Sequence, residues 1–305
     1  TWRSIESNME RDAASSKYYY PEIDEKVIDV TQQVIDDNHI DANMIGAISD
    51  ENFGNNKDLS GYTLNFKDMQ APSRKFWLFG AGSKLGNVSQ NVVNLTNVKG
   101  GHDMDVRGGH SYKGVSSGNA VNVVNSKVDE VKGGSTNRGS AVNNKVTVSS
   151  NSEVRVVHGG GLGFFNAGGE GKGNEVSVSG SNAFFIYGGE SQSGTISKNK
   201  VVIKADGAKR SLSRGVFGGM SASGRGDVVE NEVFISGSDV ERSYGRDIGV
   251  YGGKSNVGRA NLNKVTITSD ANGKSIIGVD IFGGASGSQL MGDPRIQALQ
   301  NEVNI

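Results

Sequence analysis

Hydrophobic and polar positions alternate with a period of two in a short segment that recurs along most of the chain. Each copy has the form Asn-x-Val-x-aliphatic, as in Asn263-Lys264-Val265-Thr266-Ile267. In an extended strand the asparagine and both aliphatic residues face one way, and the two residues between them face the other. The pattern therefore predicts an all-β chain of short strands with one apolar face each. The copies begin at Asn91, Asn119, Asn144, Asn174, Asn199, Asn231, Asn263 and Asn301.

A pair of glycines precedes each of these strands except the first, after an aliphatic and a variable residue, as in Val250-Tyr251-Gly252-Gly253; the first copy has the degenerate form Leu78-Phe79-Gly80-Ala81. The first glycine and the asparagine are 11 residues apart in five of eight copies, and the others carry insertions. The whole unit repeats every 25 to 34 residues, a period typical of solenoids. A unit this short cannot bury its apolar face alone, but stacked copies can, which predicts a parallel β-helix.

The residue after each asparagine tests whether the copies stack in register. In chain order these residues are Val92, Ala120, Lys145, Glu175, Lys200, Glu232, Lys264 and Glu302. Their charges alternate from Lys145 onward, which suits an outward column with a spacing of about 4.8 Å. We therefore expect one repeat per coil.

The inward asparagines need partners if they are buried. We expect them to lie at the corners of successive coils, in left-handed backbone, and to hydrogen-bond to one another and to the turns. The glycine pairs predict corners that are too tight for a β-carbon or that need a positive φ.

Residues 1–58 lack the repeat and are predicted to form an N-terminal cap, whereas residues 59–305 form the β-helix. Within the cap, Val27, Val30 and Val34 fit a short helix, but Val27 to Val30 could equally be a strand. Because solenoids need capped ends and this sequence ends in a repeat strand, we expect the natural protein to continue beyond Ile305.

Composition narrows the classes of function. The net charge of −1 argues against binding to nucleic acid through phosphate contacts. The chain has 45 glycines without a three-residue period, so it is not collagen, and it contains no cysteine. No apolar run approaches the 18 residues of a membrane-spanning helix.

Glycine-rich, cysteine-free coils of the form Val-Tyr-Gly-Gly followed by Asn-x-Val-x-Ile resemble the passenger domains of Gram-negative autotransporters. The resemblance covers residues 75–305. It implies a right-handed parallel β-helix that is secreted or displayed on the bacterial outer-membrane surface. It also implies a C-terminal membrane barrel, which this sequence does not include. The protein would contact a membrane only through that barrel.

The resemblance implies a non-enzymatic, adhesin-like virulence factor that binds a host cell-surface protein or glycan, with self-association as a further candidate. One alternative is a released effector, such as a toxin or a growth-factor-like ligand of a host receptor. Another is a carbohydrate-active enzyme, since such enzymes also use β-helices. A protease is disfavoured because 58 residues outside the repeat are too few for its catalytic domain.

Three features are candidate binding sites. Arg225-Gly226-Asp227, in an insertion, matches a motif that some integrins read, although such a tripeptide also arises by chance. Phe164 and Phe165, in another insertion, could bind a partner or cover the coil. The residue before each glycine pair forms a second outward column, whose aromatic half either contacts a protein or glycan or is a stabilising ladder. This column is Arg107, Lys132, His158, Tyr187, Phe217, Tyr251 and Phe282.

The sequence supports a metal-binding or catalytic site less well than any of these binding features. His102, Asp103 and Asp105, near Arg107 and His110, are the best cluster of ligand types. An alternating strand would send His102 to one face and the two aspartates to the other, so we expect a solvated strand edge. We predict no catalytic residues, no metal and no cofactor.

Overall fold

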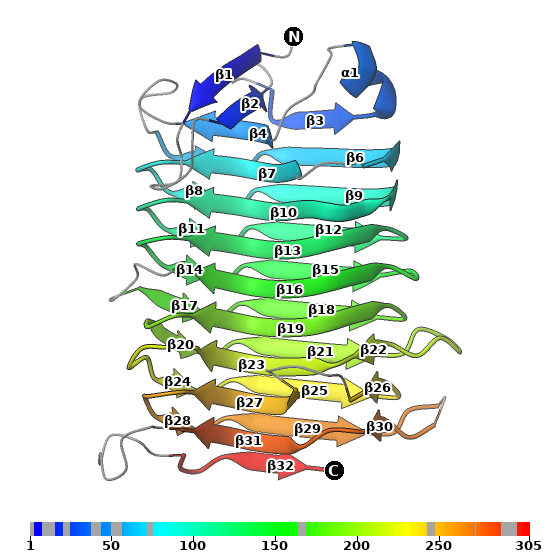
Figure 1. Cartoon of the computed structure of the whole chain (residues 1–305), viewed down its shortest axis with the longest axis vertical. Helices are drawn as coiled ribbons and strands as arrows, with labels where there is room; N and C mark the ends of the chain where they lie inside the picture. Colours follow the sequence, from blue (N-terminus) through cyan, green and yellow to red (C-terminus); the bar gives the residue numbers. More distant parts are fainter. Residues whose placement is uncertain are drawn as a thin grey trace.

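The computed structural model describes residues 3–7, 16–20, 25–37, 44–49, 57–71, 76–163, 169–242, 248–271, 273–287 and 298–305. In these residues the chain folds as a right-handed parallel β-helix, which confirms the predicted fold class. A regular coil contributes one strand to each of three sheets, and the coils stack along the long axis of the molecule (Figure 1).

Sheet 1 contains the strands that follow the repeated asparagines, and all of its neighbouring strands are parallel. In the order in which they pair, its described strands are β3 (Val27–Val30), β6 (Thr63–Gln70), β9 (Val92–Lys99), β12 (Ala120–Val124), β15 (Lys145–Ser149), β18 (Glu175–Ser179), β21 (Lys200–Lys204), β25 (Glu232–Ser236), β29 (Lys264–Thr268) and β32 (Glu302–Asn304).

Sheet 2 contains the glycine pairs. Its described strands are β1 (Arg3–Ser7), β2 (Ser16–Tyr20), β4 (Met44–Ser49), β7 (Phe76–Ser83), β10 (Gly101–Ser111), β13 (Lys127–Thr136), β16 (Glu153–Leu162), β19 (Asn182–Ser191), β22 (Leu212–Ser213), β23 (Gly215–Ser221), β26 (Asp239–Val240), β27 (Gly249–Ser255), β30 (Ile276–Ile277) and β31 (Ile281–Ser286). Both β22 and β23 pair with β19, so the strand of each later coil is split in two.

Sheet 3 closes each coil with strands of two or three residues. They are β5 (Leu59–Ser60), β8 (Val88–Ser89), β11 (Ser116–Ser117), β14 (Ala141–Val142), β17 (Glu170–Lys172), β20 (Thr195–Ser197), β24 (Val228–Val229) and β28 (Ala260–Asn261).

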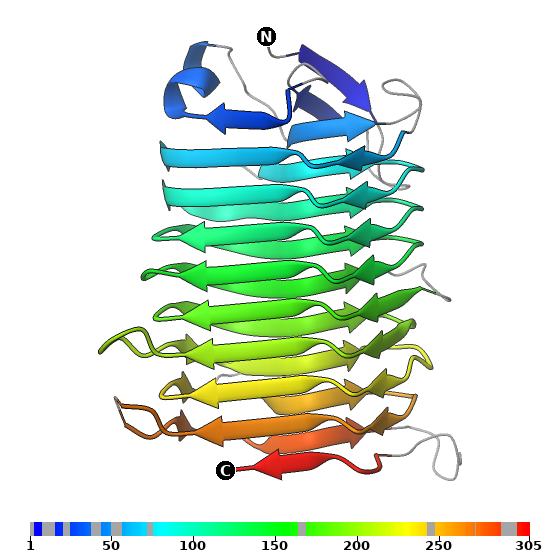
Figure 2. The ribbon, with the colours of Figure 1, turned by 180° about the vertical axis from the view of Figure 1, so that it is seen from behind.

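Of the two structures that the N-terminal pattern allowed, the strand is the one adopted at Val27 to Val30, and only Val34 of the three valines lies in a helix. Strand β3 occupies Val27–Val30, and the helix α1 (Gln32–Asp37) follows it. The hydroxyl of Thr31 accepts a hydrogen bond from the backbone N–H of Val34 and so caps this helix. Strands β3 and β4 pair in parallel with β6 and β7. Parallel stacking thus begins within the segment that the sequence predicts as a cap, and an antiparallel pair of β1 and β2 lies beyond it (Figures 1 and 2).

The inward asparagines form a continuous ladder, as predicted. Asn174, for example, donates its backbone N–H and its side-chain amide to Oδ1 of Asn199, both at 2.9 Å. Asn199 does the same to Asn231, at 3.0 and 2.9 Å. The pattern runs from Asn91 to Asn301. The left-handed residue of the corner is the one before the asparagine, such as Lys198 (φ 56°), so the expectation that the asparagine itself adopts this backbone is wrong.

The glycine pairs are required by space. A β-carbon on Gly253 would lie 2.4 Å from Cγ of Asn263, and one on Gly252 would lie 2.3 Å from the carbonyl oxygen of Gly283. The pairs lie inside the strands of sheet 2 and none of their described glycines has a positive φ, so the expectation that they form corners is wrong. The pairs therefore leave room for the asparagine side chain on one side and for the next coil on the other.

The alternating charges stack as the sequence predicts. Lys145, Glu175, Lys200 and Glu232 are successive partners across sheet 1. The Nζ atom of Lys145 lies 3.4 Å from the carboxylate of Glu175, and both side chains are partly exposed. Such pairs contribute a few tenths of a kcal/mol each. They favour the observed register but cannot be its main support.

Removing one rung of the inward ladder should weaken the fold. In Asn199→Ala, the backbone and side-chain donors of Asn174 lose their acceptor inside the coil, at a cost of at least about 2 kcal/mol. We expect a lower urea midpoint and faster proteolysis near β21. The matched control is Lys200→Ala, which changes the exposed neighbour and should cost less than about 0.5 kcal/mol. Equal effects of the two substitutions would argue against a stabilising ladder.

Candidate functional site

The Arg225-Gly226-Asp227 motif lies in the corner between β23 and β24. Arg225 is exposed, whereas Gly226 is buried. A β-carbon on Gly226 would lie 2.1 Å from the carbonyl oxygen of Gly194 in the preceding coil. The carbonyl of Asp227 accepts a hydrogen bond from the backbone N–H of Ile196 at 2.8 Å. The glycine and aspartate are therefore part of the stacked coil.

The carboxylate of Asp227 is engaged by Arg259 of the following coil. The backbone N–H of Arg259 donates to Oδ1 at 2.9 Å, and its guanidinium donates to Oδ2 at 3.0 and 2.6 Å. Burial acts to raise the pKa of Asp227, but these hydrogen bonds outweigh it and hold the pKa below its usual value. An integrin would need this carboxylate to coordinate a metal ion, so binding there would first have to break the ion pair.

The second candidate binding feature, the pair Phe164 and Phe165, lies outside the described residues. Most of the insertion that precedes Asn301 lies outside them too.

The outward column on sheet 2 is in register, and its aromatic half is a continuous stack. Ring centroids lie 5.0 Å apart from His158 to Tyr187, from Tyr187 to Phe217 and from Phe217 to Tyr251, with interplanar angles of 12° or less. Phe282 follows at 4.9 Å. Phe217 has no exposed surface and Tyr187 is 8% exposed, whereas Phe282 is 39% exposed.

This geometry favours the stabilising ladder over a binding stripe. Each ring covers the faces of its neighbours, so the faces on which a sugar could stack are already used. Met220 packs beside the stack, and the ammonium of Lys254 lies 5.2 Å from the ring centroid of Tyr251. The stack is most open at Phe282.

At its other end the stack meets a charge cluster in which His158 is buried and its charged neighbours are half-buried. Nε2 of His158 lies 3.2 Å from Glu130, whose carboxylate also lies 2.9 Å from the Nζ of Lys132. Nδ1 of His158 lies 3.0 Å from Glu190, an ionic contact rather than an aligned hydrogen bond. Burial acts to lower the pKa of His158, but the two carboxylates outweigh it and raise the pKa. Burial likewise acts to raise the pKa of each glutamate, but His158 and Lys132 lower both values.

Of the candidate metal ligands, Asp105 forms an ion pair instead, and the side chain of His102 lies outside the described part of the structure. Arg107 donates to Asp105 at 3.0 Å and also contacts the ring of His110, which in turn contacts the hydroxyl of Ser135 at 2.8 Å. Asp103 is exposed. Across the part of the chain that the structure describes, no three His, Asp or Glu side chains are grouped to hold a metal ion.

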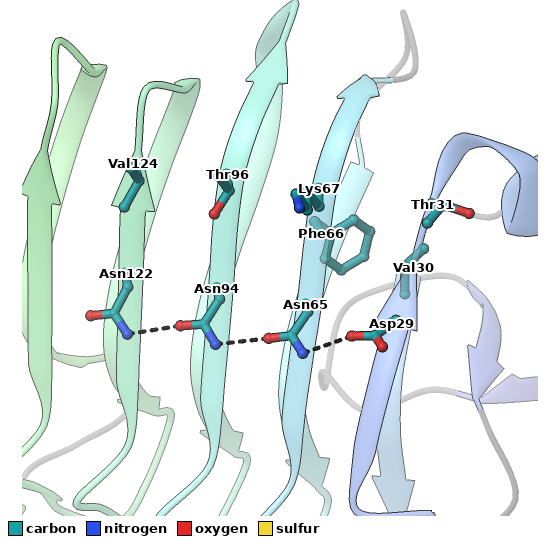
Figure 3. A pocket seen from close by; sticks show the side chains of 10 residues that line it. All are labelled: Asp29, Val30, Thr31, Asn65, Phe66, Lys67, Asn94, Thr96, Asn122 and Val124. Atoms are coloured by element: carbon teal, nitrogen blue, oxygen red, sulfur yellow. Dashed lines mark hydrogen bonds between the residues drawn. The ribbon is translucent and has the colours of Figure 1, made fainter.

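An outward groove on sheet 1 was not identified from the sequence. It has a volume of about 680 Å³ and crosses β3, β6, β9 and β12. Its floor carries a row of side-chain amides that ends on a carboxylate (Figure 3). Asn122 donates to Asn94, Asn94 donates to Asn65, and Asn65 donates to Asp29, each at 2.8 Å. The recurrence of asparagine three residues after Asn91 and Asn119 could have revealed it, because register places such residues in one column.

The charge cluster predicts a pH-dependent stability. The contribution of His158 is complete below its ordinary pKa of about 6.5 and is lost as the pH rises through its higher folded value. Glu130 and Glu190, with lowered pKa values, contribute above about 4.5 and lose this contribution as the pH falls. His158→Phe keeps the ring stack but removes the charge, which should cost about 1–3 kcal/mol near pH 6.

The measurement is the urea midpoint at pH 5.5, 7 and 8.5. The wild type should lose more stability between pH 5.5 and 8.5 than His158→Phe does. Tyr251→Phe is the control, because it changes the stack without changing the charge, and it should keep the wild-type dependence. The same pH slope in all three proteins would contradict the assignment.

The one helix among the described residues, α1, is too short and too polar to cross a membrane. Comparison of the chain with models of known protein families, with curated proteins and with solved structures yields no match.

Proposed function

We propose that this chain is a non-enzymatic attachment module, similar to an autotransporter passenger, that is displayed on a bacterial surface or released from it. It would bind a protein or glycan on a host cell. The proposal is supported chiefly by the in-register parallel β-helix, in which the inward asparagines hydrogen-bond to one another within the stack. Such a scaffold leaves its outward columns and corner loops available for binding.

Two of the corner loops that project from the stack are held in place. One joins β21 to β22 and another joins β29 to β30, both at the edge where sheet 1 leads into sheet 2 (Figure 2). Arg210 in the first loop donates to both carboxylate oxygens of Asp239, at 3.1 and 2.9 Å. It also donates to the carbonyl of Lys274 in the second loop at 2.7 Å. A partner would therefore meet a preformed surface at this edge, which lowers the entropic cost of binding.

Recognition by an integrin is the less favoured route to attachment, because Arg259 already binds the carboxylate of Asp227. A released effector would use the same scaffold and would differ in the response of the host cell. Attachment through another surface agrees best with the contacts described.

The test is attachment of the purified chain to cultured mammalian cells, with Asp227→Ala and Arg259→Ala as a matched pair. Both substitutions break the same partly exposed ion pair and should each cost less than about 1 kcal/mol of stability. Only Asp227→Ala removes the carboxylate that an integrin would read. We expect both variants to attach within about twofold of the wild type.

Loss of attachment in Asp227→Ala alone would instead establish the integrin motif. If the wild-type chain attaches to no cell type, the proposed function is wrong. A phosphorylation response that accompanies attachment would favour the effector over the adhesin.

A further inference from the structure

We propose that the groove on sheet 1 binds a neutral, extended oligosaccharide, because it places a row of oriented asparagine amides beside threonine hydroxyls on an open face. This inference rests on the proposed function and names a ligand class for the attachment. The residues that carry it are Asp29, Asn65, Asn94 and Asn122, with Thr31 and Thr96.

The ladder fixes the direction of every amide. Each of the bonds from Asn122 to Asn94 to Asn65 to Asp29 runs the same way, from amide nitrogen to oxygen (Figure 3). An asparagine amide has two N–H donors and an oxygen with two lone pairs, and the ladder bonds of Asn94 use one of each. Its remaining donor and acceptor are left for a ligand in the groove. Donors and acceptors therefore recur at about the 4.8 Å spacing of adjacent strands.

The chemistry of the lining selects the ligand class. Sugar hydroxyls both donate and accept hydrogen bonds, as do the amides and the hydroxyls of Thr31 and Thr96. Among the lining residues Asp29 and Lys67 alone are charged, and both lie toward the N-terminal end of the groove. A phosphate or sulfate ligand would need a cluster of cations, and a stable protein interface would need a much larger contact area than this groove offers, about 800 Å² on each partner.

The outward ladder of amides covers fewer coils than the inward ladder of asparagines, and this difference indicates a different role. The inward ladder runs through the coils from Asn91 to Asn301. The outward ladder of amides ends at Asn122, and the same column continues with Thr147 and Ser177; an amide recurs in it at Asn304, far outside the groove. The charged column beside it begins at Lys145, also just past the groove. The amide-rich, weakly charged surface thus coincides with the groove, which a purely structural ladder would not require.

A second outward ladder lies on the same coils, three residues further along the strands. Asn125 donates to Asn97, and Asn97 donates to Asp68, each at 2.7 Å. It too ends on an exposed aspartate at its N-terminal end. The two ladders make this part of the sheet a polar platform with one chemical direction.

The length of the groove sets the size of the ligand. From Asp29 to Asn122 the floor crosses four strands, or roughly 14 Å at the spacing of parallel strands. An extended chain of three or four sugars covers this length. Its hydroxyls, or the acetamido groups of an amino sugar, would pair with the free sides of the amides.

The experiment titrates the full chain with cellotetraose, with chitotetraose and with a sulfated tetrasaccharide. Binding is followed by calorimetry and by the side-chain amide signals in nitrogen-15 NMR. We expect a neutral tetrasaccharide to bind with a Kd of about 0.1–1 mM. The amide signals of Asn65, Asn94 and Asn122 should shift, while the signal of the inward Asn199 should not.

Two variants of one rung test the site. Asn94→Ala and Asn94→Thr should each weaken binding at least about 10-fold, and the threonine variant keeps a residue type that the column already carries at Thr147. The control is Thr266→Ala in the same column outside the groove, which should bind like the wild type. Thermal unfolding of each variant confirms that it folds.

Three outcomes would each overturn the inference. They are no binding of either neutral sugar at about 10 mM, binding of the sulfated sugar alone, and binding by the Asn94 variants that is as tight as binding by the wild type. Cell attachment distinguishes this failure from that of the proposed function. If cells are bound and neutral sugars are not, the groove is not the attachment site but the attachment function stands.

Discussion

The hydrogen bonds between inward asparagines set the register on which the rest of the structure depends. Each asparagine offers its oxygen to two donors of the preceding coil and gives its own two donors to the next, as Asn199 does between Asn174 and Asn231. A slip of one residue would turn the asparagine outward and bury a charged neighbour such as Lys200. The glycine pairs follow from the same constraint, because Gly253 leaves the space that Asn263 occupies. The apolar core adds burial energy but is less specific, because valine repeats at many positions.

Once the register is fixed, residues at one position of the repeat become neighbours in space, although they are about 30 positions apart in sequence. This explains why outward columns show coherent chemistry. Lysine and glutamate alternate down sheet 1, and aromatic rings stack at about 5 Å down sheet 2. The pair of Asp227 and Arg259 arises in the same way, since each follows the corner glycine of its coil. An outward substitution thus acts first on the coils directly above and below it.

The sequence predicted those features that depend on spacing alone. The strand period, the single coil per repeat, the asparagine ladder and both outward columns follow from counting residues. Burial could not be counted in this way: nothing in the neighbourhood of Phe217 shows that its ring is enclosed between Tyr187 and Tyr251. The position of Asp227 in an insertion likewise gives no sign that its carboxylate binds Arg259, which lies 32 positions away in the next coil. The parallel pairing of β3 with β6 could not be predicted from the repeat, because β3 does not carry the repeat motif.

The outward columns differ in how much of the interaction capacity of their side chains is used by neighbours in the same column. This difference determines where a ligand can bind. Aromatic rings cover one another's faces, and alternating charges neutralise one another, so both columns gain little by exchanging these contacts for a partner. A row of amides uses only part of its hydrogen-bonding capacity along the column. The rest must be met by water or by a ligand with matched donors and acceptors. The segment from Asp29 to Asn122 is an outward column whose own stacking leaves such capacity oriented into a groove. Its chemistry, rather than its exposure, makes it the part of the scaffold best suited to recognition.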